Sequence, residues 1–436
     1  MITIKKRTLY SLMWATILCV ACVENDKDYS DPDSSQENTL DLDIPSDFTW
    51  NTSRSVNLEV TAPVTSIVSI YTEAECSDKS LVAELPVGPE NVIEGSVDVP
   101  TSIDYLYVKY PTGESTTAIS KVKIQQKATA IRATDDNQGY LSIGTDQLLG
   151  MAAITIGSDE HQLRKYITSG NVIFEDSWPD FADYDFNDLV ADYKITSYTA
   201  NNERQYPYER IEVSVTIRAI GGSAPDKLGL RFLGDESGSL LQRHIGKYTG
   251  LDKSVNGLTA RLANPNQPDS APIFYIEGLK QLKKNGSIYY NTEQQDDKNL
   301  TTINFGIYAN EVGGSQESNK RFVQASNAYN QDFFLVTYSK REIHLRGYEA
   351  TPLYSSYEVD AAKSKDAVMS PDKTYSTDKN FVWGMKVVSD FHFPLEKVDI
   401  RQAYAPNFAK WVESNGTQLD NWFKYVWENP GTKASW

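Results

Sequence analysis

The stretch ERIEVSVTIRAIGG, Glu209–Gly222, constrains the fold more than any other segment of this chain. Apolar side chains occupy every second position from Ile211 to Ala219, and polar or charged side chains fill most positions between them. A period of two is that of a β-strand with one face in a core, whereas an amphipathic helix would repeat every 3.6 residues. The chain must therefore contain a sheet that buries one of its faces.

Similar short segments, separated by turn residues, recur along most of the 436 residues. In the first third they include SIVSIY, LVAEL, GSVDV, DYLYVKY and SKVKI, at intervals typical of a sandwich. Later segments are expected at 273–276, 302–308, 333–338 and 382–388. The pattern predicts a mainly β fold: a small Ig-like β-sandwich over 47–127, then a larger β-sandwich or jelly-roll-like domain over 128–436.

The C-terminal end has a different pattern. Helical spacing through Phe408, Trp411 and Val412 predicts a helix within Asp399–Gly416, with Asn415-Gly416 as its C-cap. A second short helix is expected at Leu419–Trp427. We expect Trp383, Trp411 and Trp422 to be buried, since each lies in an apolar context.

The N-terminus has the pattern of a targeting segment. Lys5, Lys6 and Arg7 precede the apolar run Leu9–Ala21, which is too short to span a bilayer comfortably. The run ends in CVAC, which resembles the lipobox of bacterial lipoproteins and makes Cys22 the lipidated residue. Residues 1–21 are then a lipoprotein signal peptide, and the polar, acidic residues 22–46 form a flexible tether. An ordinary signal peptide and a redox CxxC are the alternatives.

The charge of the chain and its N-terminal sequence indicate which partners and which cellular location to expect. The net charge of -17 and the lack of a basic stripe argue against a nucleic acid partner. The acidic residues after Cys22 resemble the signals that route some lipoproteins to the outer face of the outer membrane. We therefore expect an outer membrane lipoprotein of a Gram-negative bacterium, at the cell surface and held to the membrane by its lipid anchor.

The segment FEDSWPDFADYDFNDLVADY, Phe174–Tyr193, contains a dense cluster of acidic and amide side chains that could form a binding site. Carboxylate and amide oxygens are hard ligands that suit calcium, which takes six to eight of them at about 2.3–2.6 Å. The candidate metal ligands are Asp183, Asp185, Asn187, Asp188, Glu175 and Asp176. Calcium is thus the expected cofactor, and no catalytic residue is predicted.

Geometry limits how these ligands could meet. Alternate residues of a straight strand lie about 6.8 Å apart, too far for three of them to reach one ion. The segment from Asp183 to Asp188 must therefore curl into a loop, with a strand beginning near Leu189. Asp183, Asp185 and Asn187 occupy EF-hand positions one, three and five, but Asp188 stands where that loop needs glycine and Lys194 where it needs glutamate. An EF-hand is rejected.

The acidic segment has two alternatives to a calcium site. A solvated acidic turn with Asx hydrogen bonds is the structural alternative. The interleaved aromatic residues favour a loop pinned against a core, where bare carboxylates would be costly. A transition metal site is disfavoured, because the four histidines are isolated and cysteines do not cluster.

The same residues resemble the LruC-domain family of bacterial lipoproteins. FEDSWP (Phe174–Pro179) and ADYDFNDLV (Ala182–Val190) stand where that family has its Phe-Glu-Asp and Asp-Tyr-Asp-Phe-Asn-Asp blocks, with Ala182 in place of the usual glycine. The blocks REIHLRGYEAT, VWGMKV, FHFPLEKVDIRQAY and FAKWVESNGTQLDNWF follow in the family's order. The resemblance implies a surface lipoprotein and carries no established activity.

Function can be narrowed by what is missing. The sequence has no HExxH, P-loop, GxSxG or GxGxxG motif, so we expect a non-enzymatic role in adhesion or cell-envelope architecture. One alternative is a glycan-binding surface module, with exposed aromatic side chains stacking on sugars. A second is a carboxylate-dependent glycoside hydrolase, which needs only two facing carboxyls. A glycan or surface protein is the expected partner.

Overall fold

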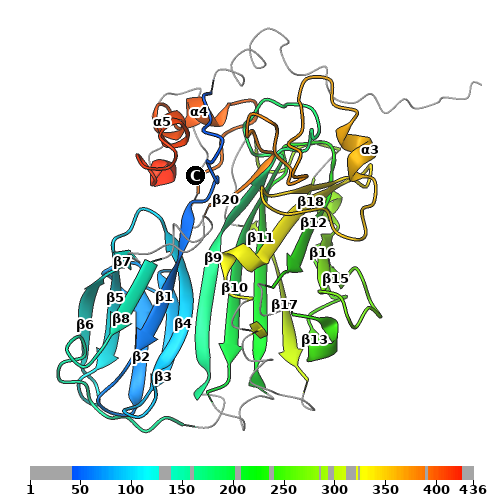
Figure 1. Ribbon diagram of the computed structural model, residues 1–436. Coiled ribbons are helices and arrows are strands. Elements are labelled where there is room, and N and C mark those ends of the chain that lie inside the picture. The colour runs from blue at the N-terminus through cyan, green and yellow to red at the C-terminus, as the bar shows by residue number, and fades with distance from the viewer. Residues whose placement is uncertain are drawn as a thin grey trace, which may run out of the picture.

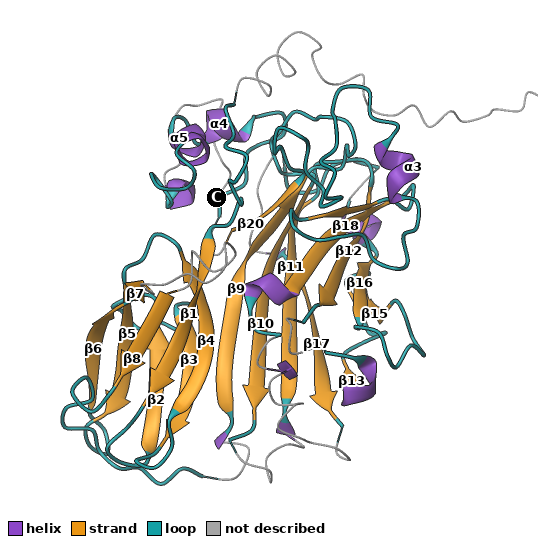
Figure 2. Cartoon of the chain, viewed as in Figure 1, coloured by secondary structure: helices purple, strands orange, loops and turns teal. Residues whose placement is uncertain are grey.

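A computed structural model shows a mainly β chain arranged as two sandwiches side by side (Figures 1 and 2). The residues that it describes are 42–126, 139–157, 162–201, 208–234, 240–283, 286–292, 299–310, 321–322, 325–387 and 391–424. The predicted signal peptide, Cys22 and the tether up to residue 41 lie outside them. The prediction of a mainly β, sandwich-like fold is confirmed.

The first sandwich has one four-stranded sheet and one half of a longer sheet. The four-stranded sheet has the order β4-β1-β8-β7, and the facing strands run β3-β2-β5-β6. Their bounds are β1 Ser53–Val60, β2 Ser66–Tyr71, β3 Leu81–Val87, β4 Ile93–Pro100, β5 Tyr105–Pro111, β6 Thr117–Lys123, β7 Gln125–Gln126 and β8 Gly139–Ile143. Alternating residues such as Val56, Leu58 and Val60 fill the core between them.

The predicted boundary between residues 127 and 128 falls before β8, and yet β8 pairs in parallel with β1. Gly139 sits opposite Val56, where an added Cβ would lie 3.1 Å from a Val56 methyl. β8 therefore completes the first sandwich. A long-range parallel pairing of this kind leaves no local sequence signal.

The second sandwich packs a six-stranded sheet against the other half of the long sheet. The six-stranded order is β14-β15-β16-β12-β18-β19, and the facing strands run β13-β17-β11-β10-β9, with β20 also paired to β9. Their bounds are β9 Arg164–Phe174, β10 Leu189–Thr199, β11 Arg210–Ala219, β12 Pro225–Phe232, β13 Ile245–Thr249, β14 Ser254–Val255, β15 Leu258–Leu262, β16 Ile273–Glu277, β17 Thr301–Ala309, β18 Gln331–Thr337, β19 Glu342–His344 and β20 Gly384–Val387.

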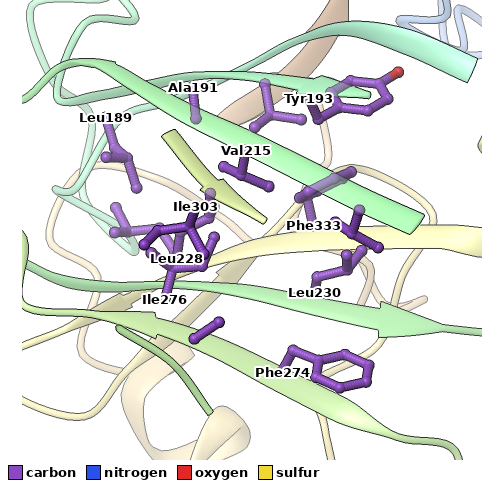
Figure 3. Close-up of a cluster of buried hydrophobic side chains, with 14 of the residues drawn as sticks. Leu189, Ala191, Tyr193, Val215, Leu228, Leu230, Phe274, Ile276, Ile303 and Phe333 are labelled. Atoms are coloured by element: carbon purple, nitrogen blue, oxygen red, sulfur yellow. The ribbon is translucent and has the colours of Figure 1, made fainter. Parts of the chain in front are cut away.

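The core of this sandwich lies between the two sheets (Figure 3). Leu189, Ala191 and Tyr193 of β10 point into it, opposite Leu228 and Leu230 of β12, as the alternation in β10 predicts. Tyr193 and Phe333 pack ring on ring with centroids 4.9 Å apart. Such contacts hold the two facing sheets against each other.

β9 joins the two sandwiches. One edge of β9 pairs along its whole length with β10. Its other edge pairs with β3 at Tyr166 and Lys165 and with β20 between Asn171 and Phe174. One continuous ten-stranded sheet thus runs through both sandwiches, which makes them a single structural unit rather than two independent domains joined by a linker.

Short helices connect and cover the strands. They are η4 Gln242–His244, η5 Leu279–Leu282, η7 Ala328–Asn330, α3 Tyr357–Ala361, α4 Ile400–Ala403, α5 Asn407–Glu413 and η8 Trp422–Lys424. The expected single helix within Asp399–Gly416 is in fact two, because Pro406 lacks an N–H and disfavours helical geometry before it. Among the described residues, none of the helices combines the length and the apolar character that crossing a bilayer requires.

A third layer covers the loop end of the long sheet on the face opposite the inter-sheet core. The helices α4 and α5 lie at this end of the molecule (Figure 1). We call the third layer the aromatic layer; its rings are Phe48, Trp50, Tyr184, Phe186, Phe381, Phe391, Phe393, Tyr404, Phe408, Trp411, Trp422 and Phe423. The predicted burial of all three tryptophans is confirmed, with Trp383 in the inter-sheet core.

Residues 42–46 belong to this layer, although they fall within the predicted tether. Leu42 is buried and Ile44 is partly buried against the layer. Asn380 donates from its amide to the carbonyl oxygens of Pro45 and Phe48, and Trp50 donates its indole N–H back to the Asn380 carbonyl. The burial of Leu42 and Ile44 explains why these residues pack against the body.

Candidate metal centre

The acidic loop, residues 175–188, links the end of β9 to the start of β10. β10 begins at Leu189, where the sequence predicts a strand to start. Before it the backbone curls: Tyr184 and Phe186 have φ of 61° and 54°, the left-handed region that non-glycine residues seldom adopt. The curl buries the Asp185 and Asn187 side chains together with both rings, which a straight strand would send to opposite faces.

Three carboxyl groups converge inside this curl. One oxygen from each of Glu175, Asp183 and Asp185 lies within 4.8 Å of the others. Two oxygens on opposite sides of a calcium ion stand about 4.8 Å apart, since each Ca–O distance is about 2.4 Å. Glu175 is 0 % and Asp185 1 % exposed, and Asp183 is half-buried. One ion could therefore touch all three groups without further rearrangement of the chain.

Glu175 is held by the backbone on only one side. Its own N–H donates to the Trp383 carbonyl at 2.9 Å, and its Oε1 accepts from the Phe186 N–H at 2.5 Å. Its Oε2 is buried and has no hydrogen-bond partner among the described residues. An unpartnered buried carboxylate oxygen is costly, and a bound cation would satisfy it.

Asp185 is oriented from two directions. Its Oδ1 accepts from the Asn187 N–H at 3.0 Å, and its Oδ2 accepts from the Lys397 N–H and from the Asn187 amide at 2.8 Å each. That amide also donates to the Pro394 carbonyl at 3.1 Å. Asn187 therefore turns its N–H groups, not its Oδ1, toward Asp185, and acts as a clamp beside the carboxyl cluster.

Asp176 and Asp188 form a neighbouring pair. The Asp176 N–H donates to Asp188 Oδ2 at 2.7 Å, and Asp176 Oδ2 accepts from the Ala224 N–H at 2.9 Å. Both carboxyls crowd Gly222, where an added Cβ would lie 2.0 Å from Asp176 Oδ2. The structure thus divides the six predicted ligands into three converging carboxyls, one clamping amide and this adjacent pair.

Burial and mutual repulsion raise the pKa of every acid in the loop that converges here. Burial, then the charge of Asp183, raises the pKa of Glu175 well above its ordinary value. Asp185 shifts the same way, through burial and then Asp183 and Glu175. Burial raises the pKa of Asp176 to about 6 despite the N–H of Ala224. The ionised cluster is therefore unfavourable until a positive charge offsets it.

Other charged residues reach the site from distant parts of the chain. Glu396 adds to the repulsion on Asp185, and Asp399 adds to that on Asp183. Lys397 and Lys283 act in the opposite sense on Asp183 and Asp176. Sequence reasoning missed all four, because no local pattern brings residues about one hundred to two hundred positions away to the loop.

The geometry so far defines a β-sandwich protein with a buried carboxyl cluster at one loop end. Residues 209–423 match the family described as Domain of unknown function (DUF4842), and residues 65–134 match Domain of unknown function (DUF4841). None of the curated proteins matches the chain. The LruC resemblance stays a prediction, since the matching families carry other descriptions.

Solved structures show the fold. The crystal structure of a "Putative lipoprotein from Bacteroides ovatus" is similar, with a TM-score of 0.66 and 20% identity over 86% of this chain and 100% of that chain. The full-length major pilin SpaD from Corynebacterium diphtheriae also matches, at 9% identity over 69% of this chain and 65% of the other, with a TM-score of 0.17, which is too low to indicate a shared fold. The chain thus shares the fold of a solved Bacteroides protein described as a lipoprotein.

Proposed function

We propose that this chain is a lipid-anchored, non-enzymatic protein of the bacterial cell envelope whose acidic loop binds a structural calcium ion. Lipidation at Cys22 holds the body at the outer membrane, where it serves adhesion or envelope architecture. The CVAC motif and the likeness to a solved protein described as a lipoprotein support the anchor. Replacing Cys22 with serine should move the protein from the membrane fraction to the soluble fraction.

Two observations carry the calcium proposal: the convergence of Glu175, Asp183 and Asp185, and the buried Glu175 Oε2, which has no hydrogen-bond partner among the described residues. The donor set is entirely oxygen, which suits a hard cation. Burial, and after it the charge of neighbouring acids, raises the pKa of each carboxyl, and a bound ion would offset both effects. It would also tie the end of β9 to the loop before β10, beneath the aromatic layer.

Burial argues for a structural rather than a catalytic role. A glycoside hydrolase needs two carboxyls in an open cleft with a sugar between them. Glu175 and Asp185 are essentially inaccessible, and their oxygens approach within 4.8 Å of each other. A substrate could reach neither group without a rearrangement of the loop.

Isothermal titration calorimetry with calcium on chelator-treated protein tests the proposal. Wild type should bind one ion per chain, and magnesium should compete poorly because it prefers smaller, octahedral sites. Asp183→Asn removes one ligand at a half-buried position and should abolish measurable binding. Asp146→Asn, an exposed loop position in the first sandwich, should bind as wild type does. Equal binding by both variants would contradict the site.

A further inference from the structure

The outer groove lies on the face of the long sheet that looks away from the inter-sheet core, over β9, β10, β11 and β17. Its volume is about 410 Å³. The aromatic layer covers only the loop end of this face, at Val190 and Ala219. Farther along the same strands, Lys194, Ser214 and Asn304 stand in register across β10, β11 and β17 and line the open groove.

Strand register arranges the groove in rows. At one end Tyr198, Arg210 and Tyr308 stand opposite one another, with the Arg210 guanidinium 3.8 Å from the Tyr198 ring centroid. Lys247 from β13 lies 4.7 Å from the centroid of Tyr308. This row of stacked cations and rings forms a stiff end wall, because each ring holds a cation against it.

The floor of the groove is low and polar. The middle row is Thr196, Glu212 and Gly306, and Gly306 has no side chain to fill the space. An added Cβ at Gly306 would lie 2.7 Å from Thr249 Oγ1 and 2.9 Å from the Tyr308 ring, so the depression depends on glycine. Hydroxyl, amide and carboxylate groups at this depth suit a ligand that presents many hydroxyls.

The groove is cationic on an otherwise acidic chain. Glu212 is balanced by Arg210, whose Nε lies 2.8 Å from it. Lys165 and Lys194 line the groove and make no ion pair in the part of the chain that the structure describes, although Glu84 lies opposite Lys165 across β3. Even with Glu84 beside Lys165, the two lysines make this face positive on a chain whose net charge is -17, which favours an anionic ligand.

Spacing favours an extended ligand over a single ion. Lys165 on β9 pairs with Tyr198 on β10, and Tyr198 is four residues from Lys194 on the same strand. The backbones of Lys165 and Lys194 therefore lie about 13 Å apart along the strand direction. The polar floor lies between them. A chain with acidic groups at intervals and hydroxyls between them matches both the lysines and the floor.

We propose that the outer groove binds an acidic oligosaccharide that carries uronic acid carboxylates. Lys165 and Lys194 pair with its carboxylates, and Thr196, Ser214 and Asn304 bind its hydroxyls. The site is separate from the acidic loop and does not depend on calcium. An acidic peptide offers the same charges without the hydroxyls, so it is an outcome that the test must separate.

Calorimetry with defined oligomers tests this assignment. The probes are hexagalacturonate and a hyaluronan hexasaccharide, with maltohexaose as the neutral saccharide and hexaglutamate as the acidic peptide. At least one uronate probe should bind wild type, more weakly at higher salt because screening reduces the ion pairs. Maltohexaose and hexaglutamate should bind at least about tenfold more weakly, a difference of about 1.4 kcal/mol.

Variants locate the site. Lys194→Glu should weaken uronate binding about tenfold or more, as each reversed charge repels the ligand. Lys123→Glu makes the same change at an exposed strand position on β6 in the first sandwich and should leave binding unchanged. Absence of binding by either uronate, equal losses in both variants, or hexaglutamate binding as tightly as the saccharides would each overturn the proposal.

Discussion

Glu175→Gln should change stability in opposite directions without and with calcium. In chelator the variant removes a buried charge that Asp183 and Asp176 repel, and it keeps an oxygen to accept the Phe186 N–H. The new amide also places a donor beside the carboxyls of Asp183 and Asp185. The variant should therefore melt at a higher temperature than wild type in chelator.

With calcium the order should reverse. At a calcium concentration 100 times the dissociation constant, binding adds about 2.7 kcal/mol to wild type. The single unit from residue 42 to residue 424 has an unfolding entropy of roughly 0.8 kcal/mol/K, at about 2.1 cal/mol/K per residue, so its melting temperature rises roughly 3 °C. If the lost carboxylate weakens binding about 100-fold, the variant gains only about 0.4 kcal/mol, or roughly 0.5 °C.

Differential scanning calorimetry in chelator and in calcium measures both effects. Glu209→Gln is a matched control: Glu209 is also 0 % exposed, one oxygen accepts a backbone N–H from Ala200, and the other has no partner among the described residues. It lies outside the acidic loop, so its calcium increment should equal that of wild type. A full calcium increment in Glu175→Gln would refute the reasoning about the cluster.

Three further outcomes are expected. Burial raises the pKa of Glu209 to about 7, so its folded form holds the proton longer and stability should fall as pH rises from about 4.5 to 7; Glu209→Gln should remove on the order of 3 kcal/mol of that loss in pH-dependent urea melts. Gly222→Ala forces a methyl group into the carboxyl pair and should cost about 1–3 kcal/mol, whereas Gly88→Ala, whose Cβ meets only Thr65 at 3.7 Å, should cost far less in the same melts. Asp332→Ala strands the buried Arg231, its partner at 2.6 Å, and should lower stability by about 3–5 kcal/mol, while an unchanged midpoint would contradict that ion pair.

The acidic loop shows how far sequence reasoning reaches. Leu189 begins β10, and its alternate residues enter the core as the period of two predicts. The need for a curl between Asp183 and Asp188 followed from strand spacing alone, and the positive φ of Tyr184 and Phe186 supplies it. The spacing of residues along a strand was sufficient to predict this curl, because that spacing limits positions within a few residues of one another.

Long-range contacts lay beyond that reasoning. Lys397 donates to Asp185 across 212 positions of sequence, and Asn380 binds the Phe48 carbonyl across 332. β8 pairs with β1 in parallel more than eighty residues away. Each contact depends on how whole elements pack, which a short window of residues does not encode. The break between α4 and α5 at Pro406 was predictable from the sequence, because proline disfavours helical geometry in the residue before it. The sequence prediction followed the helical spacing of the apolar residues instead and so expected one helix.

The aromatic layer determines where mechanical load would enter this molecule. Within the described residues, a pull from the N-terminal side acts first on Leu42 and Phe48, which pack among rings from the C-terminal part of the chain. Trp50 meets Phe408 and Trp411 there, and β1 begins only three residues later. Tension from this side would have to separate the packed rings of the aromatic layer before it could pull β1 out of its sheet. The aromatic layer would therefore protect the folded body against unfolding by force applied at its N-terminal side.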